Sequence, residues 1–174
     1  EGLFTQGMVC HETYKDENNK WLSPDEVFTD NGKDFFKIKD KKKILVGPSE
    51  SMSKSKRNTI DPEKIMDQFG ADSVRFFILS DSPPEKDVQW SEQGMQASYK
   101  FVQKFWNLHC EIEEILKNKN LIKKKENQNI DDKINIFTNQ IIQKITYNLE
   151  NFHYNVIIAN FYEIYNFLNQ NLKN

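Results

Sequence analysis

The sequence predicts an α+β fold in which helices dominate, with short strands near the beginning and helices over the rest. Two observations support this prediction. Up to about residue 46, short apolar runs are separated by turn residues such as Ser23-Pro24 and Asn31-Gly32, a pattern typical of short strands. From Pro62 onward, apolar residues recur every three or four positions, as the buried face of a helix requires.

Length and composition indicate a globular protein. A chain of 174 residues, 37% hydrophobic and 29% charged, can bury a core as one large domain or two small ones. Its apolar runs fall far short of the roughly 20 residues that cross a bilayer. We therefore expect a cytoplasmic protein without membrane contact. Because the chain begins with Glu1 and its last helix has no terminator, we also expect a piece of a longer protein.

Charge and cysteine content narrow the function classes. Residues 33–57 carry nine Lys and Arg against three acidic residues, a local charge of +6 in a chain of net charge −2. Such a basic arm on an acidic body suits contact with a polyanion at one place. Cys10 and Cys110 lie far apart and lack the spacing of zinc ligands, so we predict neither a disulfide framework nor a metal site.

The first 46 residues predict strands. Residues 1–11 are interpreted as a buried strand that ends near a site, in which Gly7 lets a ligand or another backbone approach closely. An ordinary turn at Gly7 is the alternative. Asn31-Gly32, between the apolar segments 27–29 and 35–38, predicts a hairpin whose two central turn positions have positive φ.

Helix signals begin at Asp61. This residue is a predicted N-cap, followed by Pro62 at the first helical position, and Gly70 is the expected end. Asp72 is predicted to cap the next helix, which ends before Pro83-Pro84. Ser91 is predicted to cap a long third helix.

The third helix carries an apolar stripe that predicts its buried face. Its members are Met95, Tyr99, Val102, Phe105, Trp106, His109, Ile112 and Leu116. His109 is interpreted as a core histidine rather than a ligand. A polar connection over 117–128 precedes a fourth helix on Ile134, Phe137, Ile141, Ile145 and Leu149. A fifth, from about Asn155, is apolar on several sides, so we expect further packing partners beyond Asn174.

The segment from Pro48 to Pro62 is the strongest functional signal. Its inner part, Ser51 to Asn58, contains three hydroxyls and three cations without a β-branched residue. This composition is typical of a mobile loop that closes over phosphate, because Lys, Arg and hydroxyl groups all donate to phosphate oxygens. A solvated basic loop is the alternative.

Ser51 to Ser55 resembles the Lys-Met-Ser-Lys-Ser (KMSKS) signature of class I aminoacyl-tRNA synthetases, with Ser51 in place of the first Lys. Four blocks resemble the leucyl members of that family: residues 2–9, 56–62, 70–77 and 80–91. The resemblance extends from Glu1 to about Trp106. It implies a domain order: 1–46, the end of a Rossmann-like nucleotide-binding domain with a small β-hairpin insertion; 47–60, the KMSKS-type loop; 61–90, stem-contact helices; and 91–174, a truncated, antiparallel anticodon-binding helical bundle.

The resemblance also implies an activity. Leucine would be activated by ATP with Mg²⁺ and transferred to tRNA(Leu), with no metal bound by the protein here. Lys54 would be the catalytic residue. The matching residues are, for ATP, Ser51, Met52, Ser53, Lys54 and Ser55; for phosphate or tRNA, Lys56 and Arg57; and for the adenine side, Gly7, Met8 and Val9. The family's His-x-Gly-His element does not occur, so we expect this chain to be inactive without an N-terminal catalytic half.

Three alternatives remain at this point. The chain could be a non-catalytic module that binds tRNA through residues 33–57 and the helices. It could belong to a class I synthetase for isoleucine, valine or methionine, although the block at 80–91 favours leucine. A helical scaffold without an RNA role is the simplest alternative.

Overall fold

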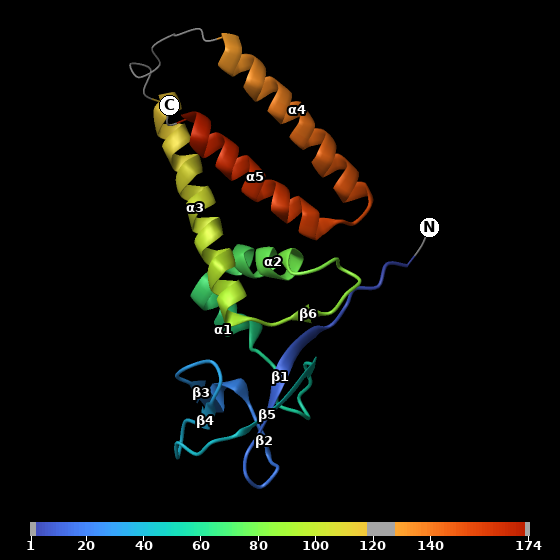
Figure 1. Cartoon of the computed structure of the whole chain (residues 1–174), viewed down its shortest axis with the longest axis vertical. Coiled ribbons are helices and arrows are strands. Elements are labelled where there is room, and N and C mark those ends of the chain that lie inside the picture. Colours follow the sequence, from blue (N-terminus) through green and yellow to red (C-terminus); the bar gives the residue numbers. More distant parts are fainter. Residues whose placement is uncertain (1–2, 118–127, 173–174) are drawn as a thin grey trace. The chain divides into compact units, whose positions relative to one another are not determined.

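The chain folds into strands and helices that form two compact units. The computed structural model describes residues 3–117 and 128–172 (Figure 1). The two units are made of the following stretches: Glu1–Ala71 with Glu85–Gly94, and Asp72–Pro84 with Met95–Asn174. Strands occur in the first unit, and long helices make up most of the second. The predicted mixture of strands and helices, with helices dominant, is confirmed.

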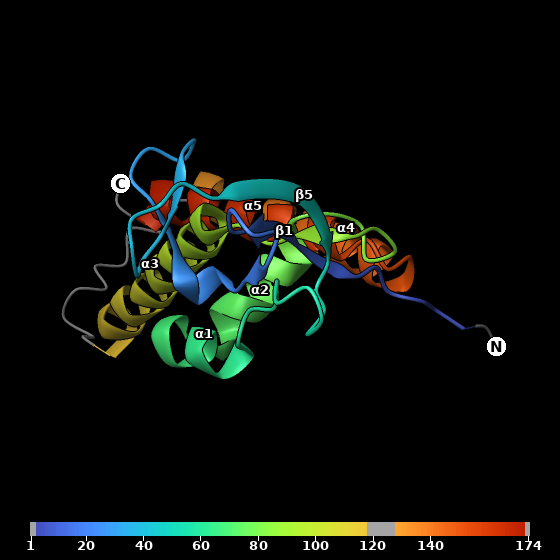
Figure 2. The same cartoon turned by 90° about the horizontal axis from the view of Figure 1, so that it is seen from below.

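Strand β1 (Val9–Lys15) is the centre of the first unit. Strand β5 (Leu45–Ser51) runs antiparallel along one edge of β1 (Figure 2). On the other edge, the short β6 (Val88–Gln89) pairs in parallel with the beginning of β1, and β2 (Trp21–Leu22) pairs antiparallel with its end. Because β1 is hydrogen-bonded on both sides, it gives the segment after β5 a fixed base.

The strand predicted over residues 1–11 is correct only from Val9 onward. Residues 3–8 form no strand, and the side chain of Leu3 is 91% exposed. Strand pairing begins only where β5 and β6 supply partners for the backbone. The close approach predicted at Gly7 is present, since a Cβ there would lie 2.0 Å from the carbonyl oxygen of Lys86. The neighbour that requires glycine is therefore another backbone segment.

The predicted hairpin is confirmed as β3 (Val27–Thr29) and β4 (Phe35–Lys37), with Phe28 opposite Phe36. Its turn differs from the expected two-residue type. The loop spans residues 30–34, and Gly32 has a φ of +70°, whereas Asn31 does not have a positive φ. The Asn31 side chain instead accepts hydrogen bonds from two later amides of the loop, both at 2.9 Å. This side-chain turn replaces the tight backbone turn.

The core of the first unit joins the sheet to the hairpin. Tyr14, Leu22 and Ile44 are buried together, and Val27 and Phe35 pack against them. The rings of Tyr14 and Phe35 stack with centroids 5.6 Å apart. The hairpin is therefore held against the sheet by apolar and aromatic contacts.

Helix α1 (Pro62–Phe69) begins and ends at the predicted residues. The Asp61 side chain accepts a hydrogen bond from the Glu63 amide at 3.0 Å. Gly70, with a φ of +78°, donates its amide to the carbonyl of Met66 at 2.8 Å. Both caps satisfy backbone groups that a helix end leaves unpaired.

Helix α2 (Ala71–Ser80) starts two residues earlier than predicted, since a cap at Asp72 would make Ser73 the first helical residue. Asp72 therefore lies in the first turn and is not the cap. There its carboxylate binds Arg75 at 2.8 Å, one turn further along the same helix. The helix ends ahead of Pro83-Pro84, as expected.

Helix α3 (Glu92–Lys117) begins after the predicted cap, since the Ser91 hydroxyl accepts the Gly94 amide at 3.1 Å. Its predicted stripe is only partly correct. Phe101 and Leu108, which lie outside the stripe, are buried, whereas Trp106 is 63% exposed. His109 is also exposed, so its interpretation as a core histidine is wrong.

Aromatic contacts explain the shifted face of α3. The ring of Phe101 lies 5.1 Å from that of Phe76 on α2 and 3.9 Å from that of Tyr162 on α5 (Tyr154–Leu172). The position of these partners, rather than the mean direction of the apolar residues, selects the buried face.

Helices α4 (Gln128–Glu150) and α5 lie side by side (Figure 1). The rings of Phe137 and Phe167 stack at 3.7 Å, and Lys144 binds Glu163 at 2.9 Å. Later residues of α4 thus pair with earlier residues of α5, so these two helices are antiparallel. A complete antiparallel bundle and a Rossmann-like end are not confirmed and stay predictions. Of the polar connection predicted over 117–128, residues 118–127 lie outside the described part, whereas Lys117 ends α3 and Gln128 begins α4.

None of the helices within the described ranges combines the length and the apolar character needed to cross a lipid bilayer.

Candidate functional site

The candidate loop follows an irregularity in β5. Glu12 of β1 pairs with Ser49, but the next residue, Thr13, pairs with Gly47, so Pro48 is an extra residue in the ladder. The Thr13 hydroxyl donates to the carbonyl of Pro48 at 3.1 Å. A Cβ on Gly47 would lie 2.4 Å from that hydroxyl. Such a bulge re-aims the end of a strand, and here it sets the direction in which β5 enters the loop.

The loop itself is a short turn closed by backbone and hydroxyl hydrogen bonds. The Met52 amide donates to the carbonyl of Val9 at 3.1 Å and extends the pairing with β1 by one residue. The Arg57 amide then donates to the carbonyl of Lys54 at 3.3 Å, and the Ser53 hydroxyl accepts the Lys56 amide at 3.3 Å. Lys54 is the first residue of this turn.

Asn58 joins the two ends of the turn. Its side chain is fully buried, with 0% exposure. Its oxygen accepts the Ser53 amide at 2.9 Å, and its Nδ2 donates to the carbonyls of His11 at 3.2 Å and Glu50 at 3.1 Å. Three backbone groups from β1, β5 and the loop are thus satisfied by one amide side chain. A buried residue with this many directed bonds fixes the base of the loop.

The three cations of the loop have different surroundings. Lys56 forms an ion pair with Glu50. The Arg57 guanidinium binds the Glu26 carboxylate at 3.1 Å and the carbonyl of Trp21 at 3.2 Å. Lys54 is exposed and forms no ion pair within the described residues. Its ammonium is therefore free to meet an external anion.

Glu26 is held in its charged form by its neighbours. The Ser23 amide donates to the Glu26 carboxylate at 2.8 Å, and this bond is the main reason that the pKa of Glu26 lies below its ordinary value. The charge of Arg57 lowers the pKa further. Hydrogen bonds and an opposite charge both favour a carboxylate over the neutral acid.

The structure brings several predicted residues together and leaves their roles untested. Residues 51–55 are consecutive at the end of β5 and in the turn. The Ser53 and Ser55 hydroxyls, on either side of Lys54, lie 3.2 Å apart. Residues 7–9 lie beside the entry to the loop, because Val9 accepts the Met52 amide.

Sequence reasoning missed Asn58, Glu50 and Glu26. Asn58 could have been suspected, since a polar residue at the junction of a loop and a capped helix often binds backbone groups. Ser23-x-x-Glu26 has the spacing of a capping box, which marks a helix start, but the sequence does not reveal its partner Arg57, which is distant along the chain.

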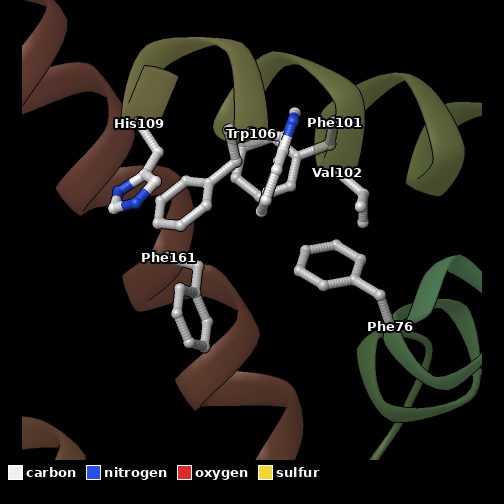
Figure 3. A pocket seen from close by; sticks show the side chains of 7 residues that line it. Phe76, Phe101, Val102, Trp106, His109 and Phe161 are labelled. Carbon is white, nitrogen blue, oxygen red and sulfur yellow. The ribbon is translucent and has the colours of Figure 1, made fainter. Parts of the chain in front are cut away.

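Two cavities compare poorly with the loop as sites for a polyphosphate. One, of about 370 Å³, lies among the helices of the second unit, where side chains from α2, α3 and α5 surround it (Figure 3). Its lining residues are Phe76, Phe101, Val102, Phe105, Trp106, His109 and Phe161. The other, of about 580 Å³, lies in the first unit and is lined by groups such as Glu12, Tyr14, Trp90 and Glu92. Neither lining includes Lys or Arg, which phosphate recognition favours.

No group of three or more His, Cys, Asp or Glu residues in the described ranges is arranged to hold a metal ion.

Comparison with known proteins shows what the chain is similar to. The family model for class I tRNA synthetases (I, L, M and V) matches residues 43–91, which include the loop. The leucine–tRNA ligase of Acidiphilium cryptum (strain JF-5) is 41% identical over 165 residues, covering 95% of this chain and 19% of that protein. The leucine–tRNA ligase of Rickettsia bellii (strain RML369-C) is 40% identical over 166 residues, with the same two coverages.

A solved structure supports the same relationship. The crystal structure of a ternary LeuRS–tRNA–LeuAMS complex from Agrobacterium radiobacter K84 matches 70% of this chain and 16% of that chain, with a TM-score of 0.61 and 27% identity. The chain spans about a fifth of the length of the curated relatives it matches. The chain is therefore similar to leucine–tRNA ligases over nearly its whole length, and its residues 43–91 match the family model for class I tRNA synthetases.

Proposed function

We propose that the chain is part of a leucine–tRNA ligase, which activates leucine with ATP and Mg²⁺ and then transfers it to tRNA(Leu). The similarity to leucine–tRNA ligases over 95% of the chain supports this assignment. The structural observation that carries it is the exposed Lys54 ammonium, without an ion pair in the described part, on a turn whose base is fixed by buried Asn58.

We assign the parts of the chain accordingly. Residues 1–46 end the nucleotide-binding domain and include the hairpin insertion, 47–60 form the KMSKS-type loop, 61–90 contact the tRNA stem, and 91–174 begin the anticodon-binding helices. The remaining contacts to ATP, and the pocket for leucine, belong to parts of the complete protein outside this segment.

Lys54 acts on the leaving group in this proposal. Attack of the leucine carboxylate on the α-phosphate of ATP builds negative charge on the departing pyrophosphate. A cation that reaches those oxygens mainly in the transition state raises kcat. Ser53 and Ser55 supply neutral donors on either side. Lys56 forms an ion pair with Glu50, so it is poorly placed to take the role of the first signature lysine, which Ser51 replaces in this chain.

The proposal predicts the kinetic effect of Lys54→Ala in the complete protein that carries this segment. The variant should lose about 2 to 4 kcal/mol of transition-state stabilisation, as for the loss of one preorganised donor. The kcat for leucine-dependent ATP–pyrophosphate exchange should therefore fall roughly 30- to 1,000-fold. The KM for leucine should change little, because the ammonium acts on the leaving group.

Two controls accompany that variant. Arg75→Ala removes an exposed cation from helix α2 and should leave kcat near that of the unchanged protein, whereas an equal loss would show general damage to the fold. Lys56→Ala removes the neighbouring cation of the same loop and should have a smaller effect than Lys54→Ala. Replacing leucine by isoleucine, valine or methionine in the exchange assay separates the proposed ligase from its close relatives in the family.

A further inference from the structure

We propose that Glu26 is a positioning residue for Lys54, acting through Arg57. This inference rests on the proposed function and adds to it the means by which the turn is held. Glu26 ends the short 3₁₀ helix η1 (Pro24–Glu26), in the segment between β2 and β3. Its carboxylate binds Arg57, the residue that closes the turn.

The carboxylate of Glu26 is itself rigidly placed. Its Oε2 accepts the Ser23 amide at 2.8 Å, as the Glu of a capping box does, and it also accepts the Ser23 hydroxyl at 3.1 Å. The same oxygen lies 3.1 Å from a guanidinium nitrogen of Arg57. A second guanidinium nitrogen donates to the carbonyl of Trp21 at 3.2 Å. Arg57 is thus bound at two points of a segment that does not belong to the loop.

The contacts of the Arg57 side chain stabilise an unusual backbone conformation at this residue. Its φ is +55°, in the left-handed region that residues other than Gly, Asn and Asp seldom adopt. Such a conformation is unfavourable by itself and persists when surrounding contacts stabilise it. In this conformation the Arg57 amide donates to the carbonyl of Lys54 at 3.3 Å and closes the turn. Holding the Arg57 side chain therefore holds the backbone of Lys54.

The neighbouring Asp25 provides a matched comparison. It lies on the same short helix and forms an ion pair at 2.9 Å with Lys64, which belongs to helix α1 beyond the loop. Asp25 and Glu26 carry the same charge on adjacent residues, but only the Glu26 pair includes a residue of the turn. Removing each charge separately distinguishes an effect on the position of the turn, expected only for Glu26, from an effect of the total charge of η1, expected for both residues.

The test uses the complete protein with Glu26→Gln, Arg57→Gln, the double variant and Asp25→Asn. Gln at position 26 still accepts from Ser23 but loses its charge. Because Glu26 and Arg57 are partly exposed, with side-chain exposures of 38% and 41%, we expect a moderate effect, about three- to fivefold. The kcat for exchange should fall by this factor in both single variants, with the KM for leucine unchanged, and the double variant should lose no more than either single one.

Limited proteolysis gives a readout that does not depend on activity. Trypsin cleaves after Lys54, and cleavage requires the turn to open. We expect cleavage at Lys54 to accelerate about three- to fivefold in Glu26→Gln and Arg57→Gln, and to stay unchanged in Asp25→Asn. Arg57→Gln replaces a partly exposed side chain and serves as the second variant if Glu26→Gln folds poorly.

The outcomes separate the two proposals. Additive losses in the double variant, or equal effects of Asp25→Asn and Glu26→Gln, would overturn the role of Glu26 while leaving the ligase assignment intact. Absence of leucine-dependent exchange in the unchanged complete protein would overturn the proposed function, and with it the catalytic purpose of the Glu26 contact, whatever the proteolysis shows.

Discussion

The Lys54 loop and the helical unit are stabilised by different kinds of interaction. In the loop, directed polar bonds dominate: Asn58 binds three backbone groups, and Arg57 binds a carboxylate and a carbonyl. In the helical unit, aromatic rings dominate, with Phe101 in contact with rings from both α2 and α5. The comparison indicates that the polar contacts of the loop fix the position of its turn, whereas the aromatic contacts of the helical unit stabilise its fold.

This difference predicts how each region responds to substitution. Apolar packing is roughly proportional to buried area, so it tolerates a change of shape better than a loss of volume. Directed hydrogen bonds respond to the loss of a single atom, because the partner left behind is buried and unpaired. The variants below test that contrast, from the largest expected effect to the smallest.

Phe101→Ala should cause the largest loss of stability. Phe101 is 7% exposed and contacts four other aromatic rings, and truncation of a buried Phe costs about 3 to 5 kcal/mol. Urea unfolding of the chain, followed by circular dichroism, measures this free energy. Phe101→Leu keeps most of the apolar volume and should cost about 1 kcal/mol.

Trp106→Ala is the control in the same helix, because this side chain is 63% exposed. It should lower the free energy of unfolding by less than about 1 kcal/mol. If Phe101→Ala proved no more destabilising than Trp106→Ala, the aromatic cluster would not be the source of cohesion in this unit.

Asn58→Ala should cost less stability but disturb the loop more. It leaves the carbonyls of His11 and Glu50 and the Ser53 amide without their partner, and we expect a loss of about 2 kcal/mol. The matched control is Asn151→Ala. The Asn151 side chain also donates to a backbone carbonyl, that of Tyr147 at 2.7 Å, but it does so at an exposed position. That variant should change stability by less than about 0.5 kcal/mol.

Asn58→Gln sharpens the same comparison. Gln has the same amide on a longer side chain, so it cannot keep the geometry of all three hydrogen bonds in a fully buried, close-packed site. We expect Asn58→Gln to be nearly as destabilising as Asn58→Ala, in contrast to the mild Phe101→Leu. Stability close to that of the unchanged chain would mean that the loop adapts as readily as the aromatic cluster.

The same contrast explains which features the sequence predicts. Local signals succeeded: the Asp61 cap, Pro62, the end at Gly70 and the pairing of β3 with β4 all depend on residues close together in the chain. The buried face of α3 differs from the predicted stripe because it depends on partners from α2 and α5, which the periodicity of the sequence does not reveal.

Within the candidate site, the sequence identified Lys54 and missed Asn58 and Glu26, which hold its turn. Lys54 belongs to a recognisable signature and lies exposed on its turn. Asn58 and Glu26 act through partners distant in sequence, His11 and Arg57. The distant partners of such polar residues are not apparent until the fold brings them together.

The smallest expected effect concerns the titration of Glu26. Its pKa in the folded chain lies below the ordinary value of 4.5, so the unfolded chain binds more protons as the pH falls. The stabilising contribution of this carboxylate is therefore present above pH 4.5 and is lost as the pH falls through the lower, folded pKa. Carboxyl ¹³C NMR measures the titration midpoint directly. Asp16, whose pKa is lowered mainly by the Lys20 amide, is the internal control.

Arg57→Gln separates the causes of that shift. The Ser23 amide is the largest single cause of the lowered pKa of Glu26 and exceeds the opposing effect of burial. In the variant the midpoint should therefore rise yet stay below 4.5, with Asp16 unchanged. An unmoved midpoint would show that the Arg57 contact does not form in solution. A midpoint that reached the ordinary value would make Arg57 the main cause and the capping box secondary. The expected partial rise would show that the hydrogen bonds from Ser23 fix the charged form of the Glu26 carboxylate and that Arg57 adds to this effect.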